Sequence, residues 1–129
     1  MFETARDYLE VIEARLIASS TVKSFHLLRQ ETLGDVGLYR LRAELIDGSE
    51  LTMFERFRIA GNQAEIEKYS FHWQSSDGAL IRRWDNAPHH PQLPSFPHHV
   101  HEGANSNVLP HEPMNGLSAI REIEAALKE

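Results

Sequence analysis

Two kinds of hydrophobic repeat divide the chain. Residues 3–19 carry apolar side chains at intervals of three and four, which is the helical period, and residues 114–128 repeat that pattern. Between them the period is two, with turn residues separating the segments. This pattern predicts five strands, at 22–31, 38–46, 51–59, 64–75 and 79–85. Because their connections are short, we expect an antiparallel meander with the helices covering one face.

The Asp47-Gly48 pair is a strong hairpin signal, since glycine accepts the positive φ of such turns. Matching the apolar faces favours a three-residue loop at 47–49, which sets Leu51 opposite Leu45. Residues 86–113 hold all six prolines, so we expect an ordered His/Pro-rich loop in which 98–102 could form a short edge strand. The predicted fold is a single α+β domain over 1–129: N-terminal helix, five-stranded antiparallel meander sheet, loop and C-terminal helix.

Composition excludes several classes of protein. A chain of 129 residues without cysteine has neither disulfides, thiolate catalysis nor cysteine-based zinc sites. The net charge of −6 argues against a generally basic nucleic-acid binder. There is no run of 18 apolar residues and no secretory leader, so we expect a cytoplasmic protein that does not enter a membrane.

Histidine is the composition's outlier, with eight in the chain and seven between His72 and His111. His99 and His101 are two apart, so on an extended segment both imidazoles project to one side. That spacing suits a divalent metal, with Asp85, Glu55 or His89 as a third ligand. The same groups suit proton transfer without a metal. The structural alternative is a rigid surface loop whose histidines bond to backbone carbonyls; His90 and His111 look the most expendable.

Two strands carry polar residues that bear on function. Glu55 interrupts the apolar face of 51–59, which indicates either an edge-strand charge or an arginine ion pair, or else a functional carboxylate. In 64–75 the aromatic alternates predict a core face, whereas Lys68 and His72 lie on the polar face. Arg83 and Asp85 share one face of 79–85. If this strand pairs with 64–75, the two residues could lie beside Lys68 and His72.

Three runs together resemble the TumE-like family: 68–74, the Arg82-Arg83-Trp84-Asp85-Asn86-Ala87-Pro88-His89-His90 segment, and Phe96-Pro97-His98-His99-Val100-His101. The family consists of small bacterial and archaeal proteins assigned as toxins of toxin–antitoxin pairs. The resemblance covers most of the chain. It implies a cytoplasmic toxin that is neutralised by a cognate antitoxin, often one with a helix-turn-helix domain.

The sequence leaves two functions open. In the first, an RNA-cleaving toxin, two histidines among His72, His89, His99 and His101 act as base and acid, and Asp85 orients one of them. Arg82 or Arg83 would stabilise the phosphorane, and Lys68, Arg82 and Asn86 would bind substrate. A variant needs no organic cofactor but places a divalent metal on Asp85, His99 and His101. In the second, a non-enzymatic binding module, the His/Pro loop binds a divalent metal or docks a partner protein. Either function allows a homo-oligomer.

Overall fold

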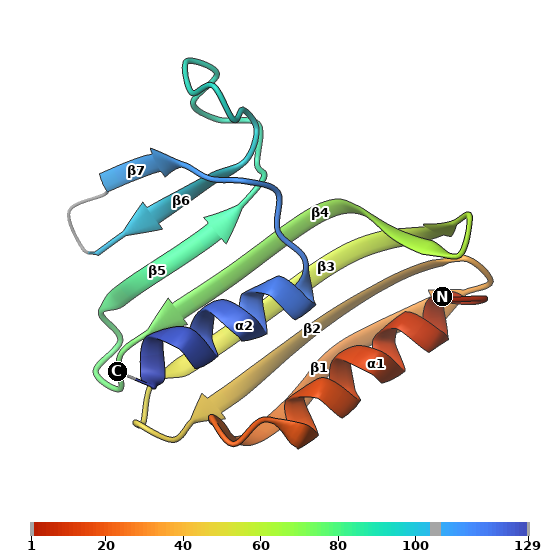
Figure 1. Cartoon of the computed structure of the whole chain (residues 1–129), viewed down its shortest axis with the longest axis horizontal. Helices are drawn as coiled ribbons and strands as arrows, with labels where there is room; N and C mark the ends of the chain where they lie inside the picture. The colour runs from red at the N-terminus through yellow and green to blue at the C-terminus, as the bar shows by residue number, and fades with distance from the viewer. Residues whose placement is uncertain (1, 104–106, 129) are drawn as a thin grey trace.

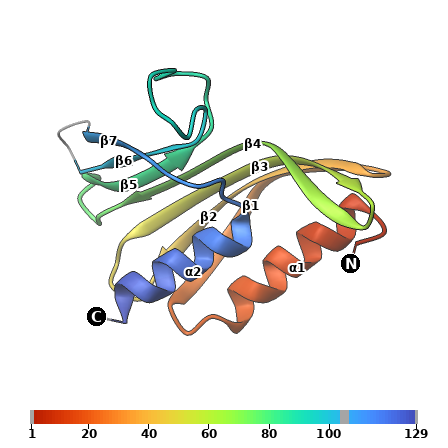
Figure 2. The ribbon, with the colours of Figure 1, turned by 45° about the horizontal axis from the view of Figure 1, so that its top comes forward.

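Among the described residues, a single antiparallel sheet of seven strands, not five, forms the centre of the molecule. The computed structural model describes residues 2–103 and 107–128. The strands follow one another in chain order, and two helices lie on one face of the sheet (Figures 1 and 2). The elements are α1 (Ala5–Ala18), β1 (Val22–Leu33), β2 (Val36–Leu45), β3 (Glu50–Ala60), β4 (Gln63–Gln74), β5 (Leu80–Asp85), β6 (His99–Glu102), β7 (Asn107–Pro110) and α2 (Gly116–Leu127). The α+β prediction is therefore correct, and the strand count is wrong by two.

The two additional strands come from the segment expected to be a loop, and β6 lies where a short edge strand at 98–102 was considered. Only residues 86–98 connect β5 to β6, and β6 is not an edge strand because β7 pairs along its outer side. β7 has four residues, of which only Val108 and Leu109 are aliphatic, and it ends at a proline. So short a strand has no alternation to detect. Its position at the sheet edge tolerates Pro110.

The β2–β3 hairpin has a different register from the one that face matching favoured. Leu51 pairs with Ala43, and Met53 pairs with Leu41. The Leu45 N–H donates to the Ser49 carbonyl over 2.9 Å, so the loop starts one residue earlier than expected. The shift is two residues, which keeps every side chain on its face but changes its neighbour.

Both helices begin at capping boxes and bury one side against the sheet. Thr4 caps α1 with Asp7 as the reciprocal partner, and Asn115 caps α2 with Ser118. The buried side of α1 carries Tyr8, Leu9, Ile12 and Leu16. In the described part of the chain, no helix has the length and apolar character needed to span a membrane.

The sheet has one buried face and one open face. Alternate residues of β2, β3 and β4 are buried, among them Leu41, Met53 and Phe71, and the two helices cover this part of the sheet (Figure 2). The intervening residues, which are mostly polar, form the face on the side away from the helices, called here the open face. The two faces separate the core from the candidate site.

Candidate functional site

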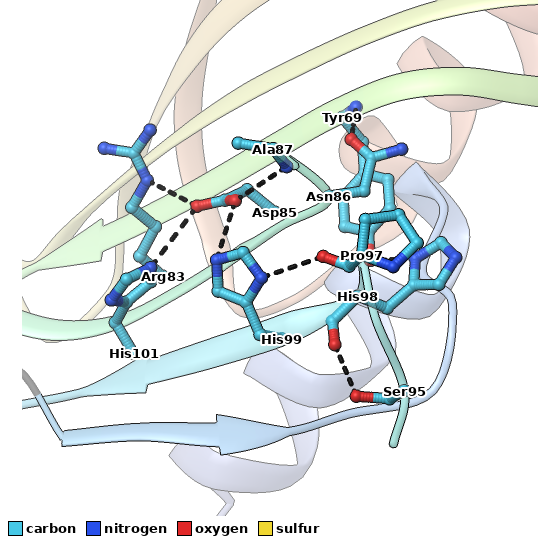
Figure 3. A network of polar contacts seen from close by, with 10 residues as sticks. All are labelled: Tyr69, Arg83, Asp85, Asn86, Ala87, Ser95, Pro97, His98, His99 and His101. Carbon is cyan, nitrogen blue, oxygen red and sulfur yellow. Dashed lines mark hydrogen bonds and ion pairs between the residues drawn. The ribbon is translucent and has the colours of Figure 1, made fainter. Parts of the chain in front are cut away.

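Asp85, the last residue of β5, is the centre of a polar cluster on the open face (Figure 3). One carboxylate oxygen, Oδ1, lies 3.0 Å from His99 Nε2 and accepts the Ala87 N–H over 3.0 Å. The other, Oδ2, lies 3.1 Å from Arg83 Nε and 3.6 Å from His101 Nε2. We call Arg83, Asp85, His99 and His101 the Asp85 cluster. Asp85 is only 5% exposed, and three basic side chains surround its carboxylate.

Strand pairing explains why these four residues meet. Asp85 pairs with His99, and Arg83 pairs with His101, across β5 and β6. Residues two apart on a strand share a face, so the spacings 83/85 and 99/101 give a compact four-residue group. The sequence indicated each pair's shared face, but not that the two strands are neighbours.

His99 is held from both sides of its ring. Nδ1 lies 2.8 Å from the Pro97 carbonyl, and Nε2 faces the Asp85 carboxylate. Both partners are acceptors when the carboxylate is ionised, so both contacts are hydrogen bonds only if each ring nitrogen carries a hydrogen. Asp85 and His99 could instead help to hold a divalent metal ion. His99 is 1% exposed, which suits a positioning role better than direct contact with substrate.

His101 is the accessible imidazole of the cluster, with 24% of its side chain exposed. Partial burial lowers its pKa; Asp85 opposes this shift, while nearby His99, Arg83 and His90 favour it. Burial, and then His99, also lower the pKa of the neighbouring His98. His98 lies outside the cluster, with Nδ1 2.9 Å from the Tyr69 hydroxyl.

His90 lies beside the cluster, although the sequence made it look expendable. Its ring centroid is 5.3 Å from that of His99 and 6.1 Å from that of His101. The residue has a φ of 59°, which is unusual for a non-glycine residue and turns the chain there. His89, which the sequence indicated as a possible catalytic residue or third metal ligand, is exposed, and the centroid of its ring is 6.4 Å from that of His90. No periodic pattern in the loop distinguishes these two histidines.

The remaining predicted site residues lie at different places. His72 is the cross-strand partner of Arg83 on the open face, and its Nε2 lies 3.2 Å from Gln74 Oε1. Lys68 is exposed on the same face, opposite Arg56. The side chain of Arg82 projects from the opposite face of β5 to Arg83, and its Nε lies 3.3 Å from Glu102 Oε2. Arg82 is therefore separated from the cluster by the sheet.

The side chain of Asn86 forms hydrogen bonds to the backbone of β4. Its Oδ1 accepts the Tyr69 N–H over 3.0 Å, and its Nδ2 donates to the Glu67 carbonyl over 3.2 Å. Glu67 is the extra residue of a β-bulge in β4, between the pairs Arg56–Lys68 and Phe57–Ile66. The Asn86 amide thus bonds to backbone groups of β4 just beyond the last β4–β5 pair, Ser70–Asp85.

Glu55 belongs to the core on the opposite face. It is fully buried and accepts hydrogen bonds from the hydroxyls of Tyr8 and Tyr39. Burial raises its pKa to about 7, although the hydrogen bonds from Tyr39, Tyr8 and the Gly116 N–H act in the other direction. The expected edge position and arginine partner are both wrong, because β3 is an interior strand and the partners are tyrosines. Glu55 also cannot be the third ligand of a His99–His101 metal site.

A metal ion could be bound by Asp85, His99 and His101. One ligand atom from each lies within 4.8 Å of the others. The contact from His99 Nδ1 to a carbonyl is the kind of outer interaction that orients metal-binding histidines. Against this, Arg83 already contacts Asp85 Oδ2 and competes with a cation for it.

Fold and site together define an α+β protein whose open sheet face carries a histidine–carboxylate–arginine cluster. The family model described as Toxin TumE matches residues 10–129, nearly the whole chain, so the chain belongs to the TumE toxin family. The resemblance of the three sequence runs is thereby confirmed. Searches of curated proteins and of solved structures found no match.

Proposed function

We propose that this TumE-family toxin cleaves RNA by histidine acid–base catalysis and is neutralised by a cognate antitoxin. The observation that carries the proposal is the Asp85 cluster, in which one carboxylate contacts two imidazoles and a guanidinium on the open face. Such a cluster contains a proton acceptor, a proton donor and a fixed positive charge. These are the groups that cleavage of a ribose phosphodiester needs.

The accessible groups suggest the roles. His101 takes the proton of a ribose 2′-hydroxyl, whose oxygen then bonds to the adjacent phosphorus. His90 gives a proton to the 5′-oxygen as its bond to phosphorus breaks, which leaves a 2′,3′-cyclic phosphate and a 5′-hydroxyl. Arg83, with 45% of its side chain exposed, stabilises the negative charge of the phosphorane. His99 and Asp85 act as positioning residues for His101.

Expression and cleavage assays test this proposal. Growth arrest and cleavage of a labelled RNA should both be lost in His101→Ala, with the cleavage rate falling roughly 10²- to 10⁴-fold. Arg121→Ala is the control, since Arg121 is exposed on α2, which lies on the opposite face of the sheet. If His101→Ala remains folded, fully toxic and fully active, the proposed site is wrong.

A metal-binding function is the second candidate, favoured by the three donor groups within 4.8 Å. The metal would either assist cleavage or hold β5 and β6 together in a non-enzymatic binding module. Calorimetric titration with Zn²⁺ separates these cases from the metal-independent one. Binding that Asp85→Asn abolishes, in a protein that cleaves no RNA, would favour the binding module.

A further inference from the structure

The sheet register aligns side chains of five strands in two straight rows across the open face. Each neighbouring pair in a row is a cross-strand partner, so the rows run perpendicular to β2–β6. We call the first row the Phe54 row. It consists of Arg40, Phe54, Ser70, Asp85 and His99. The second, here the Arg42 row, is Arg42, Thr52, His72, Arg83 and His101. Both rows end at the Asp85 cluster.

Phe54 is an aromatic ring on a face that is mostly polar. It is half-buried, and the Arg40 guanidinium carbon lies 4.9 Å from its ring centroid. The neighbouring aromatics Phe57 and Phe71 point into the core instead. Nucleobases stack both on aromatic rings and on guanidinium planes. The Phe54–Arg40 pair therefore offers a stacking surface, about two strand spacings or roughly 10 Å from Asp85.

Positive charge gathers around the same rows, despite the net charge of −6 for the whole chain. Within the rows and the adjoining Arg56–Lys68 pair, Asp85 is the one carboxylate beside five cationic side chains: Arg40, Arg42, Arg56, Lys68 and Arg83. Arg42, Arg56 and Arg83 form ion pairs with Glu50, Glu67 and Asp85, whereas in the described residues Arg40 and Lys68 take part in no ion pair. On the other side, Glu44 and Glu50 form the next row and bound the cationic strip.

We propose that single-stranded RNA binds across the strands on this face. One base stacks on Phe54 and Arg40, while the phosphates follow Arg42 and Arg83 toward the Asp85 cluster. An unpaired strand is required, because stacking on Phe54 needs a base whose face is free. The inference rests on the proposed function only for the chemistry at the end of the track; the binding itself does not depend on cleavage.

Binding can be measured apart from cleavage with a fluorescein-labelled 2′-O-methyl oligoribonucleotide, which lacks the attacking hydroxyl. By fluorescence anisotropy, Phe54→Leu should weaken binding roughly 5- to 100-fold, and Phe54→Tyr should keep it near the wild-type value. Arg40→Gln should also weaken binding, because it removes half of the stacking surface, and Arg42→Gln should lower the slope of log affinity against log salt by about 0.7. Arg121→Gln is the matched charge control, since Arg121 is exposed on α2. A duplex of the same sequence should bind more weakly than the single strand.

The outcomes separate the track from the proposed chemistry. Cleavage that is normal in Phe54→Leu and in Arg40→Gln, with unchanged affinity, overturns the track and leaves the proposed function standing. Loss of binding in both variants, with no RNA cleavage by the wild type, supports the track and overturns the proposed function. If the wild type does not bind the oligonucleotide even at low salt, the open face is not an RNA track and is available to a protein partner.

Discussion

Asp85 and His99 face each other across β5 and β6, with a carboxylate oxygen 3.0 Å from the imidazole Nε2. The other ring nitrogen of His99 already points at the Pro97 carbonyl. A ring between two acceptors cannot satisfy both with a single hydrogen. The Pro97 carbonyl and the Asp85 carboxylate together fix the orientation of the His99 ring.

Replacement of Asp85 by Asn should remove the need for a hydrogen on both ring nitrogens of His99. With its Nδ2 in the place of Oδ1, the Asn amide can donate to His99 Nε2 while Nδ1–H donates to Pro97, so one ring hydrogen then suffices, and the hydrogen bond from the Ala87 N–H is lost. Long-range ¹⁵N–¹H NMR should show the Nδ1–H form of His99 in Asp85→Asn. RNA cleavage should fall roughly 10²- to 10⁴-fold, since His101 also loses its carboxylate. Asp77→Asn, in an exposed turn, is the control and should change neither. An unchanged cleavage rate in Asp85→Asn would contradict the role given to this carboxylate.

Chelation should leave cleavage intact. Arg83 Nε lies 3.1 Å from Asp85 Oδ2, so one oxygen of the carboxylate is already neutralised by a fixed cation. We expect cleavage rates of protein treated with EDTA and then dialysed to match those of untreated protein. Activity that disappears with EDTA and returns on addition of one divalent metal would instead support the site formed by Asp85, His99 and His101.

Stability should fall as pH rises through the range set by Glu55. Its pKa is about 7 in the folded protein against an ordinary value of 4.5, so the folded state holds the proton more tightly. The contribution of Glu55 to stability is therefore fully present below pH 4.5, declines between 4.5 and about 7, and has fallen by roughly 3 kcal/mol above that. In Glu55→Gln this decline should be absent, as measured by urea unfolding at several pH values. Glu65→Gln, at an exposed position on β4, should keep the wild-type dependence. Parallel pH curves for wild type and Glu55→Gln would refute the assignment.

Gly116→Ala should destabilise the protein even though alanine favours helices. A Cβ at this position would lie 2.7 Å from Glu55 Oε1 and 2.8 Å from the Tyr39 hydroxyl. Alanine gains about 1 kcal/mol of helix propensity, whereas overpacking a core costs about 1–3 kcal/mol. We expect a net loss in the free energy of unfolding, measured with urea. Glu122→Ala, at an exposed position on the same helix, should stay within about 0.5 kcal/mol of wild type. A Gly116→Ala protein more stable than wild type would show that α2 is not packed closely on Glu55.

Hydrophobic periodicity was enough to predict the long elements. α1, α2 and the first five strands all have several alternating or helical repeats, and each begins within two residues of its predicted start. β7 has no repeat to read, because a four-residue strand that ends at Pro110 contains only two alternations. The hairpin register was wrong for a related reason. A shift of two residues keeps all faces matched, so face matching cannot distinguish Leu51 opposite Leu45 from Leu51 opposite Ala43.

The candidate cluster could be predicted only in halves. The spacing of two placed Arg83 with Asp85, and His99 with His101, but pairing between β5 and β6 is a tertiary fact. His90 reaches the cluster through a loop conformation with positive φ, which histidine only weakly favours. The partners of Glu55 were also hidden, since Tyr8 comes from a helix and lies 47 residues away in sequence.

The position of β6 has a mechanical consequence for the toxin. His99 and His101 sit on a strand of four residues that is held on one side by β5 and on the other by the equally short β7. Short terminal strands open at a fraction of the free energy of global unfolding. A binding partner that peeled β7 from the sheet would loosen both imidazoles without touching either of them. Inhibition by separation of the edge strand β7 from β6 would then leave the core and both helices intact.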